Sequence, residues 1–144
     1  MRTHTILIAH RDAAFADALA ASLRTRGYFL LIECPGPLPP QRCVRCDKGY
    51  CPLTEGADLM IYDPRLTSPD EQGNPHYLAV ESALAHPDVP MLLAWSPQEP
   101  PDPALLRTIR AAAPHIRIAA HDPALLLQQI HQLLDAPQPA GVVQ

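Results

Sequence analysis

The strongest constraint on the fold of this chain is the alternation of short apolar runs with amphipathic segments. Between the runs, apolar residues recur at helical spacing, as in the segment that carries Phe15, Leu19 and Leu23. Parallel strands that alternate with helices connect by right-handed crossovers and place helices on both faces of the sheet. We therefore predict an α/β fold with strands at Thr5–Ala9, Tyr28–Ile32, Leu59–Tyr62, Met91–Trp95 and Ile116–Ala120.

Capping signals predict where the helices begin. Asp-Pro pairs at 102–103 and 122–123 each supply an N-cap followed by proline at the first helical position. Further helices are expected from about residue 12 to 26 and from about 75 to 85. Five strands and four helices fit a flavodoxin-like, doubly wound parallel sheet of order 2-1-3-4-5. The second crossover helix would be replaced by a Cys- and Pro-rich loop at 34–57.

Length and charge limit the domain count and the partners. With 144 residues, of which 47% are hydrophobic, the chain fits one α/β domain over 1–136 and a flexible tail over 137–144. A net charge of −4 argues against direct nucleic-acid binding. No apolar run reaches the roughly 18 to 20 residues that span a bilayer, and the N-terminal run is too short for a signal peptide. We expect a cytoplasmic protein that does not bind membranes.

Four stretches of sequence carry a resemblance to a known family. They are ILIAHRDAAFADALAASLRTRGY, ADLMIYDPRL, DVPMLLAWS and DPALLLQQIHQLL. In their order and in the α/β rhythm around them, the chain resembles a response-regulator receiver domain over roughly residues 4–135. The resemblance implies a signalling role exercised by protein binding, with Asp63 at the phospho-acceptor position.

The positions that support phosphoryl transfer in receiver domains are changed. Two acidic residues normally follow the first strand and bind Mg²⁺ with the acceptor, but His10 and Arg11 stand here. Trp95 replaces the hydroxyl residue of the fourth strand, and alanine replaces the lysine that ends the fifth. The single lysine of the chain lies elsewhere, in the cysteine-rich segment. We therefore predict a divergent pseudo-receiver that is not phosphorylated.

We predict that the residues around Asp63 form a degenerate phospho-acceptor site. We also predict that the chain has no catalytic residues and is not an enzyme. His10 or Arg11 would lie beside Asp63, because the carboxyl ends of neighbouring strands meet at one edge of the sheet. An opposite charge there would favour the ionised carboxylate and fill the metal position. An unusual phospho-site or a ligand-binding carboxylate is the alternative for Asp63.

All cysteines fall within one short segment. The spacing Cys34-x8-Cys43-x2-Cys46-x4-Cys51 includes a CxxC pair, which is a common half-site for a tetrahedral metal ion. Four thiolates suit a zinc ion, and they also suit a [4Fe-4S] cluster. We predict that the four cysteines bind one metal, with zinc as the first assignment. Two disulfides or free thiols are the remaining alternatives.

The leading hypothesis is an atypical receiver-like domain that regulates an unidentified protein partner and carries a four-cysteine zinc site. Trp95 and the proline-rich loop from Ser96 to Pro103 form a candidate partner surface. The resemblance also implies a homodimer as a possible assembly. A second hypothesis is an iron–sulfur or thiol-based redox sensor. A third is a small enzyme that uses the crevice at the carboxyl edge of the sheet.

Overall fold

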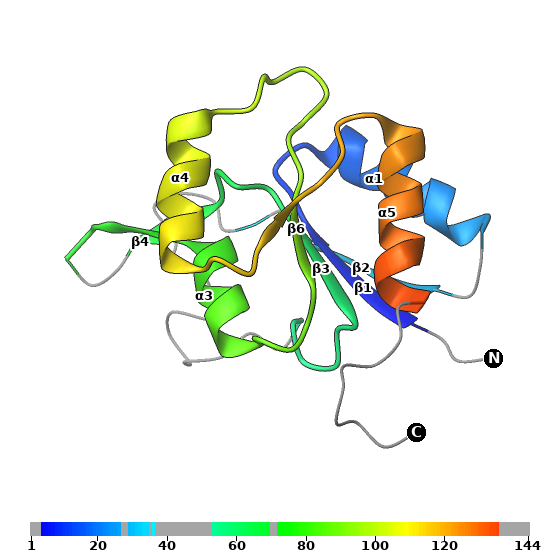
Figure 1. Ribbon diagram of the computed structural model, residues 1–144, viewed down its shortest axis with the longest axis horizontal. Coiled ribbons are helices and arrows are strands. Elements are labelled where there is room, and N and C mark those ends of the chain that lie inside the picture. The colour runs from blue at the N-terminus through cyan, green and yellow to red at the C-terminus, as the bar shows by residue number, and fades with distance from the viewer. Residues whose placement is uncertain (1–3, 27–28, 35, 37–52, 70–71, 136–144) are drawn as a thin grey trace.

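The computed structural model describes residues 4–26, 29–34, 36, 53–69 and 72–135, and its centre is a five-stranded sheet (Figure 1). The order is β2-β1-β3-β6-β7 and every pair is parallel. The predicted flavodoxin-like order 2-1-3-4-5 is thereby confirmed. The strands are β1 (His4–Ala9), β2 (Phe29–Cys34), β3 (Leu59–Tyr62), β6 (Met91–Leu93) and β7 (Arg117–Ile118).

Helices cover both faces of the sheet. The described helices are α1 (Ala13–Arg24), α3 (Leu78–Ala85), α4 (Pro103–Ala112) and α5 (Pro123–Asp135). In β1, Ile6 and Ile8 pack in one core with residues of α1 and α5, while Leu7 and Ala9 pack in the other with residues of α3 and α4. Because alternate side chains of a strand point to opposite faces, a wholly apolar strand is what two helical layers require. Figure 1 shows these two layers on either side of the sheet.

The predicted caps begin two of the helices. Asp12 Oδ1 accepts a hydrogen bond from the Phe15 amide at 3.1 Å, which fixes the start of α1. Asp102 Oδ1 accepts from the amides of Ala104 and Leu105, and Pro103 is the first residue of α4. These bonds satisfy amides that have no partner inside the helix.

The prediction of a helix from Pro75 was wrong in its first turn. Residues 75–77 form strand β5 (Pro75–Tyr77), which pairs antiparallel with β4 (Thr67–Pro69). The helix α3 begins only at Leu78, after Tyr77 in an extended conformation. The hairpin ahead of it includes Gly73 at φ +83°, a backbone conformation that favours glycine.

Two predicted features fall mainly outside the described residues. Cys34 ends β2 and residues 53–56 form turns, but 37–52 are not described. The replacement of the second crossover helix by a loop, and the flexible tail at 137–144, therefore stay predictions. No helix in the described ranges is long and apolar enough to cross a membrane.

Candidate functional site

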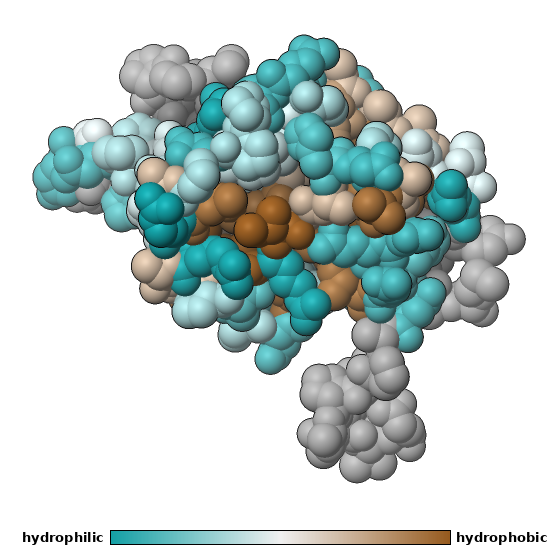
Figure 2. Space-filling view, turned by 45° about the horizontal axis from the view of Figure 1, so that its top comes forward, coloured by the Kyte–Doolittle hydropathy of each residue, from teal (hydrophilic) through white to brown (hydrophobic). Residues whose placement is uncertain are grey.

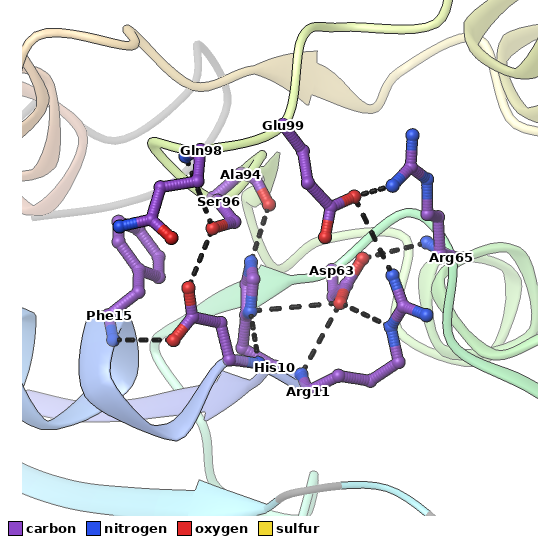
Figure 3. Close-up of polar contacts among 10 residues, drawn as sticks. His10, Arg11, Phe15, Asp63, Arg65, Ala94, Ser96, Gln98 and Glu99 are labelled. Carbon is purple, nitrogen blue, oxygen red and sulfur yellow. Dashed lines mark hydrogen bonds and ion pairs between the residues drawn. The ribbon is translucent and has the colours of Figure 1, made fainter.

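The carboxyl ends of β1 and β3 bring Asp63 together with His10 and Arg11. The Asp63 amide donates to the Ala9 carbonyl at 2.7 Å, which continues the β1–β3 pairing to the end of both strands. On the other side of β1, the His10 amide donates to the Cys34 carbonyl at 3.0 Å. These backbone bonds hold the site residues at one edge of the sheet, as the predicted strand order requires (Figure 3).

Asp63 is a buried carboxylate with three hydrogen-bond donors. Arg11 Nε donates to Asp63 Oδ2 at 2.8 Å, and the Arg11 amide donates to the same oxygen at 3.3 Å. The Arg65 amide donates to Oδ1 at 2.9 Å. The Asp63 side chain is 5% exposed and that of Arg11 is 46% exposed, so the cation reaches the site from the solvent side. The predicted proximity of a cation to Asp63 is confirmed, and the cation is Arg11.

His10 lies beside Asp63 but forms no ion pair with it. Its Nδ1 accepts from the Asp12 amide at 3.0 Å, so this nitrogen carries no proton. Its Nε2–H then donates to the Ala94 carbonyl at 2.8 Å. The 3.7 Å separation between His10 Nδ1 and Asp63 Oδ2 is therefore a contact of a neutral imidazole. His10 connects β1 to the end of β6 and does not hydrogen-bond to the Asp63 carboxylate.

Two residues that the sequence analysis did not identify complete the site. The Glu99 carboxylate binds the Arg65 guanidinium and lies 3.9 Å from Arg11 Nη2. Figure 3 shows the two arginines and two carboxylates facing one another above the sheet edge. We call His10, Arg11, Asp63, Arg65 and Glu99 the carboxyl-edge network. Two arginines balance two carboxylates, so the network contains its own counterions.

Asp12 follows Arg11 in the chain, and both oxygens of its carboxylate are bound by residues other than Asp63. The Ser96 hydroxyl donates to Asp12 Oδ2 at 2.6 Å, while Oδ1 caps α1. The hydrogen bond from Ser96, and next that from the Phe15 amide, hold the pKa of Asp12 below its ordinary value. Asp12 therefore has a structural role, because it connects the start of α1 to the loop after β6.

Trp95 does not form the partner surface that the sequence suggested. Its residue exposure is 6%, and the Arg65 guanidinium lies 5.1 Å from its ring centroid. The indole Nε1 is buried and has no hydrogen-bond partner among the residues that the structure describes. A large apolar ring at the end of β6 packs better inside than in solvent, and Arg65 covers it in cation–π geometry. That expectation for Trp95 was wrong.

Of the four cysteines, the structure describes only Cys34. It is half-buried at the end of β2 and packs on the core beneath α3 and α4. Cys43, Cys46 and Cys51 lie outside the described residues, so the four-cysteine site stays a prediction. Within the described ranges, no group of three or more His, Cys, Asp or Glu residues could hold a metal ion.

Comparisons with solved structures identify the fold. A CheY-like response regulator receiver domain protein from Methanospirillum hungatei JF-1 aligns with a TM-score of 0.59 at 19% identity, covering 93% of this chain and 95% of that one. A proposed pilus assembly protein (cpaE) from Burkholderia thailandensis E264 gives 0.59 at 17% identity, covering 90% and 97%. A proposed pilus assembly-related protein from Burkholderia pseudomallei K96243 gives 0.55 at 18%, covering 91% and 89%.

Sequence comparison alone gives no such link, since no protein-family model and no curated protein matches this chain. The likeness therefore rests on the course of the backbone through nearly the whole chain. The chain has the fold of a response-regulator receiver domain, as its sequence pattern predicted.

Proposed function

We propose that this chain is a regulatory domain of receiver fold that acts by binding a protein partner, without phosphorylation of Asp63. The observation that carries the proposal is the 2.8 Å hydrogen bond from Arg11 Nε to Asp63 Oδ2. In a receiver-like site, a metal ion would neutralise the acceptor carboxylate and the incoming phosphoryl oxygens. In this chain the guanidinium of Arg11, a fixed part of the polypeptide, neutralises the Asp63 carboxylate instead.

Phosphoryl transfer needs more than a nucleophilic carboxylate. Mg²⁺ prefers several oxygen ligands in octahedral geometry, and a guanidinium cannot supply any. The other nearby carboxylates are occupied, since Asp12 binds Ser96 and Glu99 binds Arg65. A metal at this edge would have to displace Arg11 and then share a single free carboxylate. The network thus favours a permanently neutralised site over a switch driven by phosphate.

The folds of the structural neighbours support a binding role over a catalytic one. One neighbour is a response regulator receiver domain and two are named for pilus assembly. We propose that this chain likewise works through contacts with other proteins, and that its regulated partner is a protein component of a larger assembly.

The test of this proposal is incubation with acetyl phosphate and Mg²⁺, followed by intact mass measurement. We expect the mass to stay unchanged, while a receiver domain with the full acidic set gains one phosphoryl group under the same conditions. Asp63→Asn is the matched control, because it replaces the nucleophilic carboxylate with a neutral amide of the same shape. A gain of one phosphoryl group in the native chain that Asp63→Asn abolishes would overturn the proposal.

We also propose that Cys34, Cys43, Cys46 and Cys51 bind one metal ion, with zinc as the first assignment. The spacing of the cysteines supports it, and Cys34 lies at the carboxyl edge, where its carbonyl already binds the His10 amide. Metal analysis of protein purified without air should find about one zinc per chain. Iron with absorbance at about 400 nm would assign a [4Fe-4S] cluster instead. Two disulfides and no metal would overturn the metal site.

A further inference from the structure

A small apolar pocket lies between α1 and α5, which pack on the same core of the sheet (Figure 1). The α1 residues that line it share one helix face, at i, i+3, i+4 and i+7, and they are Phe15, Ala18, Leu19 and Ser22. The α5 residues that line it are Pro123, Leu126 and Leu127. Because alanine and serine have short side chains, the α1 face leaves space in front of α5.

The size of the pocket suits one small ring compound. Its volume is about 150 Å³, whereas native cores rarely leave a space larger than a water molecule unfilled. An apolar cavity of about this volume stays dry and binds a single-ring molecule such as benzene. The lining residues Leu19, Leu126 and Leu127 are each at most 7% exposed, so a ligand against them is withdrawn from water. By contrast, the apolar area between α4 and α5 in the middle of Figure 2 lies on the open surface.

The polar groups that line the pocket are few. They are the hydroxyl of half-buried Ser22 and the imidazole of exposed His121, which lies at the mouth. Among the described residues that line the pocket, none is aspartate, glutamate, lysine or arginine. A charged ligand would lose its hydration here without gaining a counterion. An uncharged hydroxyl group, in contrast, can both donate to and accept from these two side chains.

Phe15 joins the pocket to the carboxyl-edge network. The centroid of its ring lies 4.8 Å from that of the His10 ring, with the two planes tilted by 50° (Figure 3). Asp12 accepts hydrogen bonds from the Phe15 amide and the Ser96 hydroxyl. Pro97, which also lines the pocket, directly follows Ser96. A molecule in the pocket therefore touches residues that adjoin the network and the loop after β6.

We infer that the α1–α5 pocket binds a small uncharged ring compound with one hydroxyl group, of the class of simple phenols, and that His10 senses its presence through Phe15. The ring packs against Phe15 and the buried leucines, and the hydroxyl group hydrogen-bonds to Ser22 or His121. This inference goes beyond the proposed function, because it gives the domain a small-molecule ligand at a site that neither Asp63 nor the cysteines form.

The probe is phenol, titrated into the full chain at pH 8 and followed by amide NMR. We expect saturable shifts at Phe15, Ser22 and Leu126, and a further shift at His10, because its ring contacts that of Phe15. Benzoate has the same ring but is charged, and it should bind at least tenfold more weakly than phenol. Toluene, which has the ring without the hydroxyl group, measures the apolar contacts alone.

Two sets of variants separate the ring contacts from the hydroxyl contacts. Ala18→Leu places a larger side chain in the pocket and should weaken phenol and toluene at least tenfold. Ala21→Leu, at an exposed position of α1 outside the pocket, is the matched control and should leave both within twofold. Ser22→Ala combined with His121→Ala should weaken phenol at least threefold and leave toluene within twofold. Circular dichroism verifies that each variant folds.

The binding inference fails if the native chain shows no saturable shift at the lining residues, if benzoate binds as tightly as phenol, or if Ala18→Leu binds phenol like the native chain. Equal effects of the Ser22→Ala/His121→Ala pair on phenol and toluene would overturn the role of the hydroxyl group. An unshifted His10 signal would overturn the link to the network. The native-chain titrations decide the question even if Ala18→Leu does not fold. None of these results depends on phosphorylation, so they are separate from the acetyl phosphate experiment that decides the proposed function.

Discussion

Arg11 Nε lies 2.8 Å from Asp63 Oδ2, so the end of β1 is joined to the end of β3 by a charge-assisted hydrogen bond. The Asp63 carboxylate is buried, and the Arg11 guanidinium is half exposed. A metal ion in this position could bind or leave with conditions, but a side chain remains. Arg11 therefore keeps a permanent positive charge beside the Asp63 carboxylate.

The buried carboxylate should contribute to stability through its three donors. Asp63→Asn keeps one acceptor oxygen but places an amide NH₂ against donors that now lack a partner, and we expect a loss of about 1–3 kcal/mol of unfolding free energy. Urea unfolding measures it. The exposed Asp88→Asn, in the turn after α3, is the control and should change stability by less than about 0.5 kcal/mol. Equal stability of both variants and the native chain would mean that the pair is energetically irrelevant.

An acid placed at position 11 should create a response to Mg²⁺. Arg11→Asp removes the cation and places a second carboxylate beside Asp63, so the repulsion lowers Tm in metal-free buffer. Mg²⁺ should then raise the Tm of this variant, because the ion binds the folded state. Arg11→Ala, which removes the cation without adding an oxygen ligand, and the native chain should show no such rise. A Tm of Arg11→Asp that is insensitive to Mg²⁺ would contradict this account of the site.

The middle of the sheet could be predicted because β3, β6 and residues 6–9 of β1 are buried on both faces and are therefore apolar. The edge strands β2 and β7 contain exposed residues, including Glu33 and Arg117. The start of α3 was harder to predict, because a short hairpin takes up the residues before it. Pro75 and His76 resemble a helix start in sequence, but their pairing with Pro69 and Ser68 keeps them extended until Leu78. Such a short hairpin has no long-range pattern that a sequence could reveal.

The site was predictable where strands position it and unpredictable where loops do. Arg11 and Asp63 follow adjacent strands, so their proximity depends only on strand order. Arg65 and Glu99 lie in loops, which have no hydrophobic period that could place them. The orientation of Asp12 toward Ser96 depends on a side-chain rotamer. The burial of Trp95 follows from its packing, which composition does not reveal.

The pH dependence of the Asp12 contribution has a definite sign. Because its pKa is lowered in the folded chain, Asp12 contributes full stability above its ordinary value of 3.8. That contribution is lost as pH falls through the lowered pKa. Ser96→Ala removes the largest cause of the shift, so NMR titration should find the Asp12 pKa closer to the ordinary value in this variant. An unchanged titration would show that Ser96 does not set it.

Gly36 is required by its backbone conformation and by a close neighbour. Its φ is +85°, and an added Cβ would lie 2.5 Å from Cδ2 of buried Leu66, which follows the Asp63 turn. Gly73 has a φ of +83° and open space around it, so Gly73→Ala measures backbone strain alone, about 1 kcal/mol. Gly36→Ala should destabilise more than Gly73→Ala in thermal unfolding. Equal effects would mean that Leu66 moves aside freely.

The cysteine prediction can be tested one residue at a time. Cys34→Ser and Cys43→Ser should each lower the zinc content sharply, because serine is a poor ligand for zinc and a four-thiolate site needs all its members. Cys34 is also half-buried on the core beneath α3 and α4, so its variant carries a packing cost that has nothing to do with metal. Zinc is therefore measured per folded chain after gel filtration.

If Cys34→Ser alone retains the metal, three cysteines and another ligand form the site. An open or exchangeable coordination position would then favour a reactive or sensing centre over a structural one, because chemistry at zinc requires such a position. If both variants lose the metal together, the ion fixes the segment that begins at Cys34. Since the Cys34 carbonyl accepts the His10 amide, loss of metal should then broaden or shift the NMR amide signal of His10. An unchanged His10 signal in the metal-free protein would separate the cysteine site from the carboxyl-edge network.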